Sequence, residues 1–502
     1  MSLQACARKR SPQETRGECR AGLVPRGLVR SSGVGAPPID GRPAASWTDE
    51  QRLAAGAAAA SSIRLYMYQP PPGMLPPARL EQLRSYLNGS HQGASTSQQS
   101  YFKLERWLWR DIPASMWTDE PERADFFVVP HSLISFCFHP PLQRYSVRTR
   151  LKKYLREALW PWLEAIRSRW PWYNRSCGRD HLFVYVNDQG PELDNIALPQ
   201  WDAHQGWKTA WGGNARMRAM VRSFVKIGYY GTTDAATASG WRDGVDIAVP
   251  QTWMRRGAAD ALAASAAESV KLKRAPFFFK GQEWTGTKQG CCSSGIRPWL
   301  RCALTSLAAS ANRTDVAGAP PVEAPSMPEA WFALAPAGHG CWSRRLFDAI
   351  NQGSVPVLLA TGMALPFARL LDWSSFSIDV DTESGDGRPS AALEALASSV
   401  RDPHGEGVAR ASAMVARLFD VGPWLRWVAG PKGEMHSAMG LFLVELAARR
   451  DAARRALNGS SHLPPAAAAA ARAAAGAGRD HICEEEESLG KTKRAGRAGG
   501  SK

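Results

Sequence analysis

The stretch PEAWFALAPAGHGCWSRRLFDAINQGSVPVLLATGMALPFARLLDWSSFSIDV, residues 328–380, contains the pattern of a complete strand–helix–strand unit. A Pro/Gly loop at 336–340 leads to Ser343, which stands where the N-cap of a helix is expected, and Gly353 ends that helix. Short apolar runs of this kind are typical of strands buried on both faces of a parallel sheet. The expected strands are 331–334, 355–359 and 376–380, and the expected helix is 344–351. The stretch therefore predicts a parallel α/β layer.

The start of this helix is a candidate anion site. A Gly-rich loop followed by a helix N-terminus presents free N–H groups to a diphosphate. Arg344 and Arg345 lie in the first turn, where the helix dipole disfavours cations unless an anion shares the site. Asp348 lies close to the face of Arg345, within reach of ribose hydroxyls if the arginine holds phosphate. The alternative is an ordinary Arg/Asp surface pair, and no Walker-type pattern decides between them.

A second candidate site follows an earlier buried strand, expected at 182–186. That strand leads to Asp188, and a carboxylate at a strand end is well placed to act as a general base. His181 and His131 compete for this role. The alternative is structural: Asp188 begins a tight turn, and His181 is a hydrogen-bonded structural side chain.

Length and composition indicate a globular protein of two or three domains. The chain has 502 residues, with 44% hydrophobic and 22% charged residues. The 20 tryptophans could stack on sugar rings, although most buried tryptophans serve packing. The net charge of +16 suggests a nucleic-acid partner, but no interleaved basic and aromatic recognition motif is present. We therefore expect an anionic sugar donor or a membrane face, and no nucleic acid.

The nine cysteines show no CxxC or zinc-finger spacing, so no metal is expected. Disulfides are expected if the protein enters the secretory pathway. Four N-glycosylation patterns, at Asn88, Asn174, Asn312 and Asn458, are compatible with a lumenal location.

The two ends of the chain differ in composition from its middle. Residues 1–60 lack periodicity and predict a disordered leader, and 459–502 predict a disordered tail. No stretch has the roughly 20 apolar residues of a membrane span. Other strands are expected at 63–68, 124–129, 182–186, 223–227, 245–249 and 274–281. Other helices are expected at 101–110, 145–169, 296–307 and 435–457, with two more within 391–421.

Several blocks of the chain together resemble the exostosin-like glycosyltransferases, glycosyltransferase family 47. The resemblance covers about residues 63–390, in the family's order. The blocks are TDEPERADFFVVP (118–130), a tryptophan followed by RSCGRDHLFV (170–184), DIAVP (246–250), SRRLFDAI with GSVPVL (343–358), LPF (365–367) and LDWSSFSI (371–378). The chain departs from the family pattern at Ala333 and Ser354, where cysteines are expected, which weakens any inference about the donor sugar.

The resemblance implies a GT-B-like α/β fold, in which two Rossmann-like domains face a cleft between disordered tails. The expected divisions are a leader (1–60), an acceptor domain (61–265), a nucleotide-sugar domain with closing helices (266–458) and a tail (459–502). A C-terminal helix returning to the first domain would suit this arrangement.

The resemblance further implies an inverting glycosyltransferase that moves a sugar from a nucleotide-sugar, most often a UDP-sugar, onto a polysaccharide or glycoprotein glycan. It also implies a Golgi membrane or lumenal location and possible pairing with itself or another glycosyltransferase. No metal is expected, because arginines and helix-end amides can offset the charge of the leaving diphosphate. The expected base is Asp188 or His181. The expected donor-site residues are Gly281, Arg297, Gly338, Gly340, Ser343, Arg344, Arg345 and Asp348.

Two alternatives from other classes stay open. A non-catalytic exostosin-like subunit that stabilises an active transferase would keep the fold and bind no donor. A basic nucleic-acid-binding protein would show salt-sensitive binding by its core alone.

Overall fold

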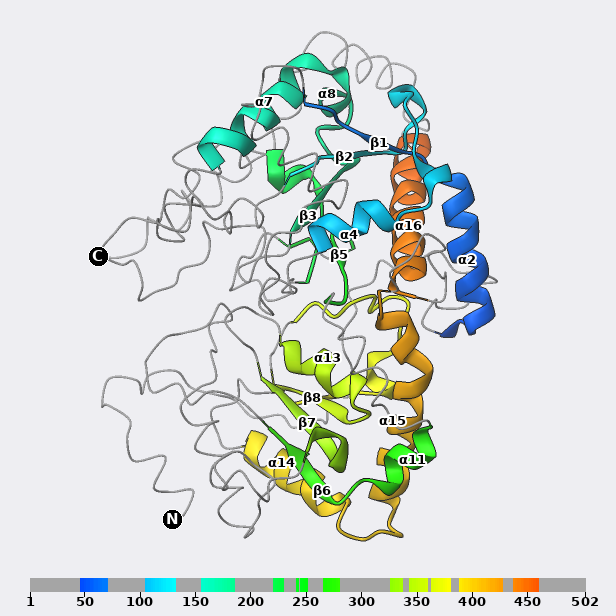
Figure 1. The fold of residues 1–502 in the computed structure, drawn as a ribbon, viewed down its shortest axis with the longest axis vertical. Coiled ribbons are helices and arrows are strands. Elements are labelled where there is room, and N and C mark those ends of the chain that lie inside the picture. Colours follow the sequence, from blue (N-terminus) through cyan, green and yellow to red (C-terminus); the bar gives the residue numbers. More distant parts are fainter. Residues whose placement is uncertain are drawn as a thin grey trace, which may run out of the picture.

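The computed structural model describes residues 46–70, 104–131, 155–185, 220–229, 241–242, 244–251, 265–279, 326–336, 343–359, 363–380, 388–427 and 437–459. These segments form two parallel sheets with accompanying helices, which confirms the α/β class. In Figure 1 the first sheet lies in the upper half and the second in the lower half. Helices α2 (Asp49–Ser62), α15 (Glu406–Val421) and α16 (Ala438–Gly459) run along one side of both.

The first sheet is formed by the early strands of the chain, each close to its expected position. All of its neighbouring strands are parallel, in the order β1-β2-β3-β4-β5. Residues of β2 through β5 are buried throughout, as expected for a sheet covered on both faces. The strands are β1 (Leu65–Met67), β2 (Phe126–Val128), β3 (His181–Tyr185), β4 (Val225–Gly228) and β5 (Ile247–Ala248).

The second sheet has the same construction, in the order β6-β7-β8-β9, again all parallel. Among the described strands, both sheets follow chain order, which differs from the 3-2-1-4-5-6 order of nucleotide-binding doubly wound sheets. The strands are β6 (Ala275–Phe278), β7 (Ala330–Pro336), β8 (Val355–Leu359) and β9 (Ile378–Asp379).

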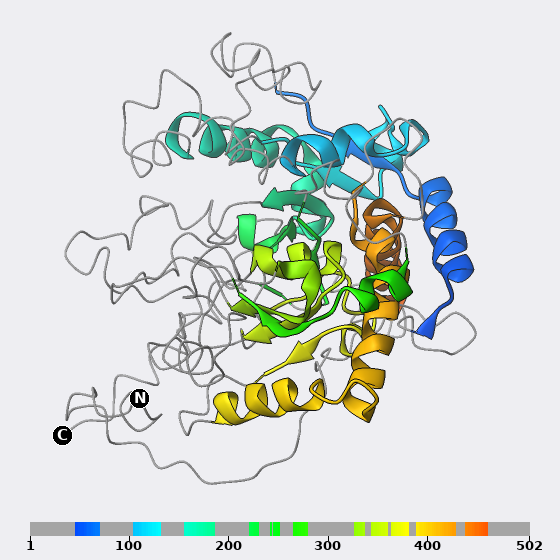
Figure 2. The same ribbon diagram turned by 60° about the horizontal axis from the view of Figure 1, so that its bottom comes forward.

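Helices make the crossovers between parallel strands. Helix α13 (Arg344–Asn351) connects β7 to β8, as the opening stretch predicts, and buries Leu346, Phe347 and Ile350. It lies on the opposite side of the second sheet from α14 (Arg388–Ser399) in Figures 1 and 2. The described part of the expected helix at 145–169 is a short π-helix, η6 (Leu155–Leu159), continued by α7 (Trp160–Arg169). The other short elements are α4 (Leu104–Asp111), η3 (Ala114–Met116), η4 (Pro121–Arg123), α8 (Pro171–Ser176), α11 (Ala266–Lys271), η8 (Met327–Glu329), η9 (Trp373–Ser375) and η10 (Gly422–Leu425).

Gly353 ends α13 in the conformation expected of a helix-stop glycine. Its φ of +67° lies in the left-handed region, and a Cβ there would be 2.6 Å from the Ser269 Oγ of α11. Both the dihedral and the close approach require glycine at this position.

The prediction of a disordered leader over residues 1–60 is wrong from residue 49, where α2 begins. Thr48 caps this helix in a full capping box with Gln51, and α2 packs against α16. At the crossing, a Cβ on Gly56 would be 3.3 Å from the Gly440 carbonyl oxygen, so the two helices approach closely. Tertiary packing stabilises this Ala/Gly-rich helix, whose sequence lacks an apolar stripe.

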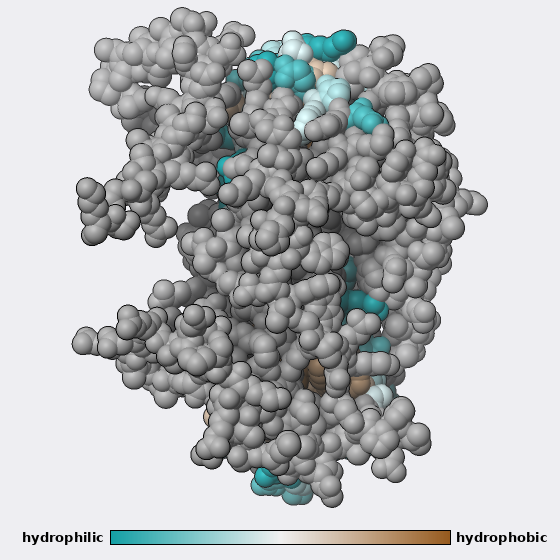
Figure 3. Space-filling model, turned by 90° about the vertical axis from the view of Figure 1, so that its left-hand side faces the viewer, coloured by the Kyte–Doolittle hydropathy of each residue, from teal (hydrophilic) through white to brown (hydrophobic). Residues whose placement is uncertain are grey.

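The C-terminal helix returns to the first sheet, as expected. Arg449 of α16 donates to the carbonyl oxygens of Val245 (2.5 Å) and Asp246 (2.7 Å), just before β5. Its guanidinium also pairs with Glu445, which lies 3.6 Å from the guanidinium of Arg369 after β8. Hydrophobic residues of both sheets belong to one continuous buried cluster. On the face in Figure 3, the described residues that reach the surface at the two ends of the molecule are mainly hydrophilic.

Candidate functional site

The N-terminus of α13 lies beyond the carboxyl end of β7 in the second sheet. Ser343 takes the N-cap position with extended backbone, φ −138° and ψ 122°, as expected. Its side chain is 2% exposed, yet Oγ has no hydrogen-bond partner among the described residues. An N-cap hydroxyl normally accepts from the helix, so this free oxygen is available to a ligand at the helix start. Gly338 and Gly340 lie outside the described residues.

The two arginines of the first turn have different environments. The Nε of Arg344 lies 3.2 Å from an Asp348 carboxylate oxygen, one turn along the helix. Arg345 instead turns toward the second sheet, with its guanidinium carbon 5.2 Å from the centre of the Phe279 ring. Phe279 directly follows β6, so Arg345 lies at the carboxyl end of that strand. Asp348 thus forms an ion pair with Arg344, and Arg345 also interacts electrostatically with the Asp348 carboxylate.

We call the N-terminus of α13, with Ser343, Arg345 and Phe279, the α13 corner. Burial shifts the pKa values of its charged groups. It lowers the pKa of Arg345 and raises that of Asp348, although the nearby arginines oppose the latter shift. A guanidinium that is partly desolvated against an aromatic ring attracts an anion more strongly than one in water. The arrangement can hold a phosphate group beside the N-terminus of α13.

The aromatic support under Arg345 was not predicted from the sequence. Phe279 reads as the last apolar residue of a buried strand, and nothing in its spacing indicates contact with the helix after the next strand. Gly281 follows it by two residues, so the loop expected to approach the ligand begins where Arg345 lies. Gly281 and Arg297 themselves lie outside the described residues.

The sequence contains a D-x-D triplet, Asp379-Val380-Asp381, which begins in β9. Asp379 is the exposed last residue of β9, and Asp381 lies outside the described residues. Within the described part of the chain, no group of three or more His, Cys, Asp or Glu side chains is arranged to hold a metal ion.

The two predicted bases differ in what the structure describes of them. Asp188 lies outside the described residues, three positions after the end of β3. His181 is the first residue of β3 and is fully buried. Its Nδ1 lies 2.7 Å from Asp180 and its Nε2 lies 2.8 Å from the Tyr68 hydroxyl. Both ring nitrogens are therefore hydrogen-bonded, the geometry of the structural alternative stated for this residue.

His131, the other competitor, lies at the opposite end of the first sheet. It follows β2 at the carboxyl edge, is 8% exposed, and stacks on Phe183 with ring centres 4.0 Å apart. Its Nε2 lies 2.6 Å from the Val184 carbonyl oxygen, and its Nδ1 has no partner among the described residues. This side chain therefore offers a free nitrogen where His181 offers none.

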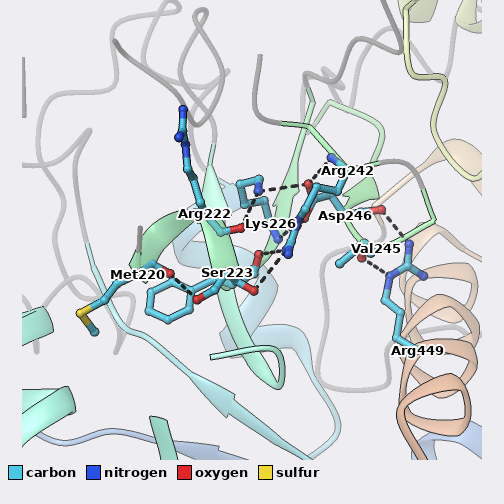
Figure 4. A network of polar contacts seen from close by, with 9 residues as sticks. Met220, Arg222, Ser223, Lys226, Arg242, Val245, Asp246 and Arg449 are labelled. Atoms are coloured by element: carbon cyan, nitrogen blue, oxygen red, sulfur yellow. Dashed lines mark hydrogen bonds and ion pairs between the residues drawn. The ribbon is translucent and has the colours of Figure 1, made fainter. Parts of the chain in front are cut away.

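Asp246, the first residue of the DIAVP block, has a structural environment. Its carboxylate lies 3.2 Å from Lys226 Nζ and accepts from the backbone N–H groups of Lys226 (2.9 Å) and Arg242 (2.7 Å). Figure 4 shows these side chains converging before β5, with Arg449 reaching in from α16. The block therefore fastens the amino edge of the first sheet, opposite the edge where ligands bind in such folds.

A match to a known domain accounts for these blocks. The exostosin GT47 domain matches residues 59–386, well over half of the chain. The chain belongs to the exostosin GT47 family. The match starts near the end of α2 and stops before α14, so most of α2 and all of α14, α15 and α16 lie outside the matched residues.

Relatives within the exostosin GT47 family are named as glycosyltransferases. A probable glycosyltransferase of Arabidopsis thaliana is 24% identical over 277 residues, covering 53% of this chain and 44% of the relative. A probable glucuronosyltransferase of Oryza sativa subsp. japonica is 24% identical over 275 residues, covering 54% and 59%. A probable beta-1,4-xylosyltransferase of Arabidopsis thaliana is 24% identical over 268 residues, covering 53% and 57%. The matched part spans about half the length of these relatives.

Two further observations concern the described part of this exostosin-family chain. Cys177, at the end of α8, is disulfide-bonded, and its partner lies outside the described residues. Within the described residues, no helix is both long and apolar enough to cross a membrane.

Proposed function

We propose that this protein is an inverting glycosyltransferase that uses a nucleotide-sugar, of the UDP-sugar class, to extend a polysaccharide or glycoprotein glycan. Membership of the exostosin GT47 family supports sugar transfer. The observation that carries the donor site is the partly desolvated Arg345 guanidinium, which lies over Phe279 beside the N-terminus of α13. That corner combines a cation, the N-terminus of a helix and a Ser343 hydroxyl without a hydrogen-bond partner among the described residues.

In the proposed mechanism, the amides of α13 and Arg345 hold the donor diphosphate. An acceptor hydroxyl attacks the anomeric carbon from the opposite side, the bond from that carbon to the diphosphate oxygen breaks, and the configuration inverts. The hydroxyl proton passes to a base, for which Asp188 after β3 remains the proposed residue. Arg345 and the helix amides offset the negative charge that develops on the leaving diphosphate.

The other proposed donor contacts have supporting roles. The Arg344–Asp348 ion pair fixes the Asp348 carboxylate, which we assign to the ribose hydroxyls. Gly281, Gly338 and Gly340 would allow the backbone to approach the donor closely, and Arg297 would supply a second cation. Each of these assignments rests on the sequence pattern.

The proposed arrangement is GT-B: the second sheet binds the donor, and the first sheet binds the acceptor across a cleft. The proposed location is the Golgi lumen, and the disulfide at Cys177 supports an oxidising compartment. Assembly with a second glycosyltransferase chain is proposed on the family resemblance alone.

The donor site can be tested by the effect of UDP on the melting temperature. UDP at a hundredfold excess over its dissociation constant would stabilise the wild type by about 2.7 kcal/mol. Arg345→Ala should abolish this shift. Arg344→Ala is the matched control and should lower the affinity only modestly, since its contact is Asp348. Equal UDP stabilisation of the wild type and Arg345→Ala would remove the assignment.

The same assay can identify the donor sugar. UDP-glucuronic acid and UDP-xylose come first, because relatives are named as glucuronosyl- and xylosyltransferases. UDP-galactose, UDP-glucose, UDP-N-acetylglucosamine and UDP-arabinose complete the panel. Repeating the titration with EDTA tests the metal-independent mechanism. If no nucleotide-sugar binds, the non-catalytic subunit role is the one supported.

A further inference from the structure

Two polar side chains at the carboxyl edge of the first sheet are buried with unpaired atoms. His131 follows β2 and Gln251 follows β5, and they are 8% and 2% exposed. Among the residues that the structure describes, His131 Nδ1 and both amide atoms of Gln251 lack hydrogen-bond partners. Buried polar groups without a partner destabilise the fold, and native proteins keep few of them without a purpose.

The tautomer of His131 is fixed by its surroundings. A carbonyl oxygen only accepts, so the 2.6 Å contact with Val184 places the ring proton on Nε2. Nδ1 therefore presents a lone pair. Stacking on Phe183, at an interplanar angle of 13°, holds the ring plane. Burial also lowers the pKa of His131 to about 4, so the ring is neutral at physiological pH.

Gln251 offers the complementary chemistry on a fixed backbone. The preceding Pro250 accepts a 2.7 Å hydrogen bond from the indole of Trp427, and Ala248 accepts one from the backbone of Phe367. The free amide can both donate and accept. Sugar hydroxyls also do both, and neither Gln251 nor neutral His131 carries a charge that would select an anion.

Sheet topology gives the spacing of the two groups. All strands of the first sheet are parallel, so residues that follow β2 and β5 lie at the same edge, with β3 and β4 between them. Three strand spacings correspond to about 14 Å. That span exceeds a single sugar ring and suits a short oligosaccharide.

We propose that this edge binds an uncharged oligosaccharide stretch of the acceptor, with His131 Nδ1 accepting from one hydroxyl and the Gln251 amide bonding to another farther along the chain. This inference rests on the proposed glycosyltransferase function and names the class of acceptor. Internal water molecules are the competing occupants.

Two substitutions separate a ligand site from a structural one. His131→Gln retains an N–H that can reach the Val184 carbonyl oxygen and removes the acceptor at the Nδ1 position. Gln251→Leu removes the amide at similar size. Because the amide is unpaired in the free protein, its loss should raise the melting temperature of the free protein. Each variant should bind a neutral oligosaccharide about tenfold more weakly while keeping the UDP-induced shift. His404→Gln, at an exposed position, is the control.

The probes are short oligosaccharides of xylose, glucose and mannose, with oligogalacturonic acid as the charged comparison, measured by isothermal titration calorimetry. The inference is overturned if the wild type binds none of the neutral probes or prefers the charged one. It is also overturned if both variants bind like the wild type. A lower melting temperature for Gln251→Leu with unchanged glycan affinity would assign the amide to internal water. If the wild type does not bind UDP, the proposed donor site is overturned instead, and the glycan inference is judged by the glycan titrations alone.

Discussion

At the scale of single residues, the two arginines of the proposed donor site have different contacts. Asp348 lies three positions from Arg345 and four from Arg344, and both spacings place side chains on one helical face. The structure pairs Asp348 with Arg344, at 3.2 Å, and leaves Arg345 against Phe279. Arg345 packs against Phe279, which follows β6, and the spacing of residues within the helix does not indicate this contact. His181 shows the same limit, because its partner Tyr68 is far away in sequence.

The neutral state of His131 predicts a pH dependence of stability. Its pKa falls from an ordinary 6.5 to about 4 because burial disfavours the charged ring. Between these values the unfolded chain binds a proton that the folded protein does not, so this residue lowers the free energy of unfolding as the pH falls from 6.5 to 4. The full effect is about 3 kcal/mol, and none is expected above pH 6.5.

Urea unfolding at pH 7 and pH 4.5 measures this dependence. His131→Gln cannot titrate and should lose less stability on acidification than the wild type. If the two proteins lose the same stability, His131 is not buried as a neutral ring.

A substitution of Asp246 tests the network of polar contacts in Figure 4. Asp246→Asn leaves Lys226, 1% exposed, without its carboxylate, and breaking a buried pair in this way costs about 3–5 kcal/mol. The control is Glu120→Gln, which breaks an exposed pair with Arg123 and should cost less than about 1 kcal/mol. Chemical denaturation compares them, and similar losses would mean that the network is solvated.

At the scale of elements, apolar runs predicted the strands well, and α2 shows where composition misleads. The strand at 355–359 matches its prediction, because a run buried on both faces needs no partner information to be recognised. Helix α2 has no apolar stripe, so its Ala/Gly-rich sequence resembles a linker. The signal that could have found it is the Thr48–Gln51 capping box.

Because α2 and α16 cross closely, we expect a large side chain at Gly56 to loosen their packing, and the same side chain elsewhere on α2 to have no such effect. Gly56→Leu would force a side chain into the Gly440 backbone and separate the helices, so amide exchange in α2 should accelerate. Ala57→Leu places the same side chain at an exposed position of the same helix and should leave the exchange unchanged. Equal protection in both variants would show that α2 is not held by this contact.

At the scale of the whole molecule, parallel sheets and a returning C-terminal helix were predictable, whereas the links between the two halves were not. Those links join residues distant in sequence: Arg52 of α2 donates to the Leu370 carbonyl oxygen after β8, and Trp427 to that of Pro250 after β5. Each involves at least one residue in an irregular segment, Leu370 in one case and Trp427 with Pro250 in the other, and such segments leave no periodic signature. These contacts and the shared core tie each half to elements outside the family domain.

Arg449 of α16 makes two hydrogen bonds to the segment before β5, and its loss should act on one half selectively. Arg449→Met keeps the aliphatic stem but removes the hydrogen bonds to Val245 and Asp246, and it leaves Glu445 with Arg369 as its remaining partner at 3.6 Å. Amide exchange should therefore accelerate in β4, β5 and the middle of α16, while β7 and β8 stay protected.

The exposed Arg410→Met in α15 supplies the control for lost charge alone. Uniform acceleration across both sheets would mean that the halves open as one unit, because the shared hydrophobic cluster would then dominate over the Arg449 contacts. Acceleration confined to the first sheet would mean that α16 holds the acceptor half of the proposed enzyme to its donor half. In that case the variant should retain the UDP-induced shift in melting temperature, because α13 packs on the second sheet, whose strands β7 and β8 stay protected from amide exchange.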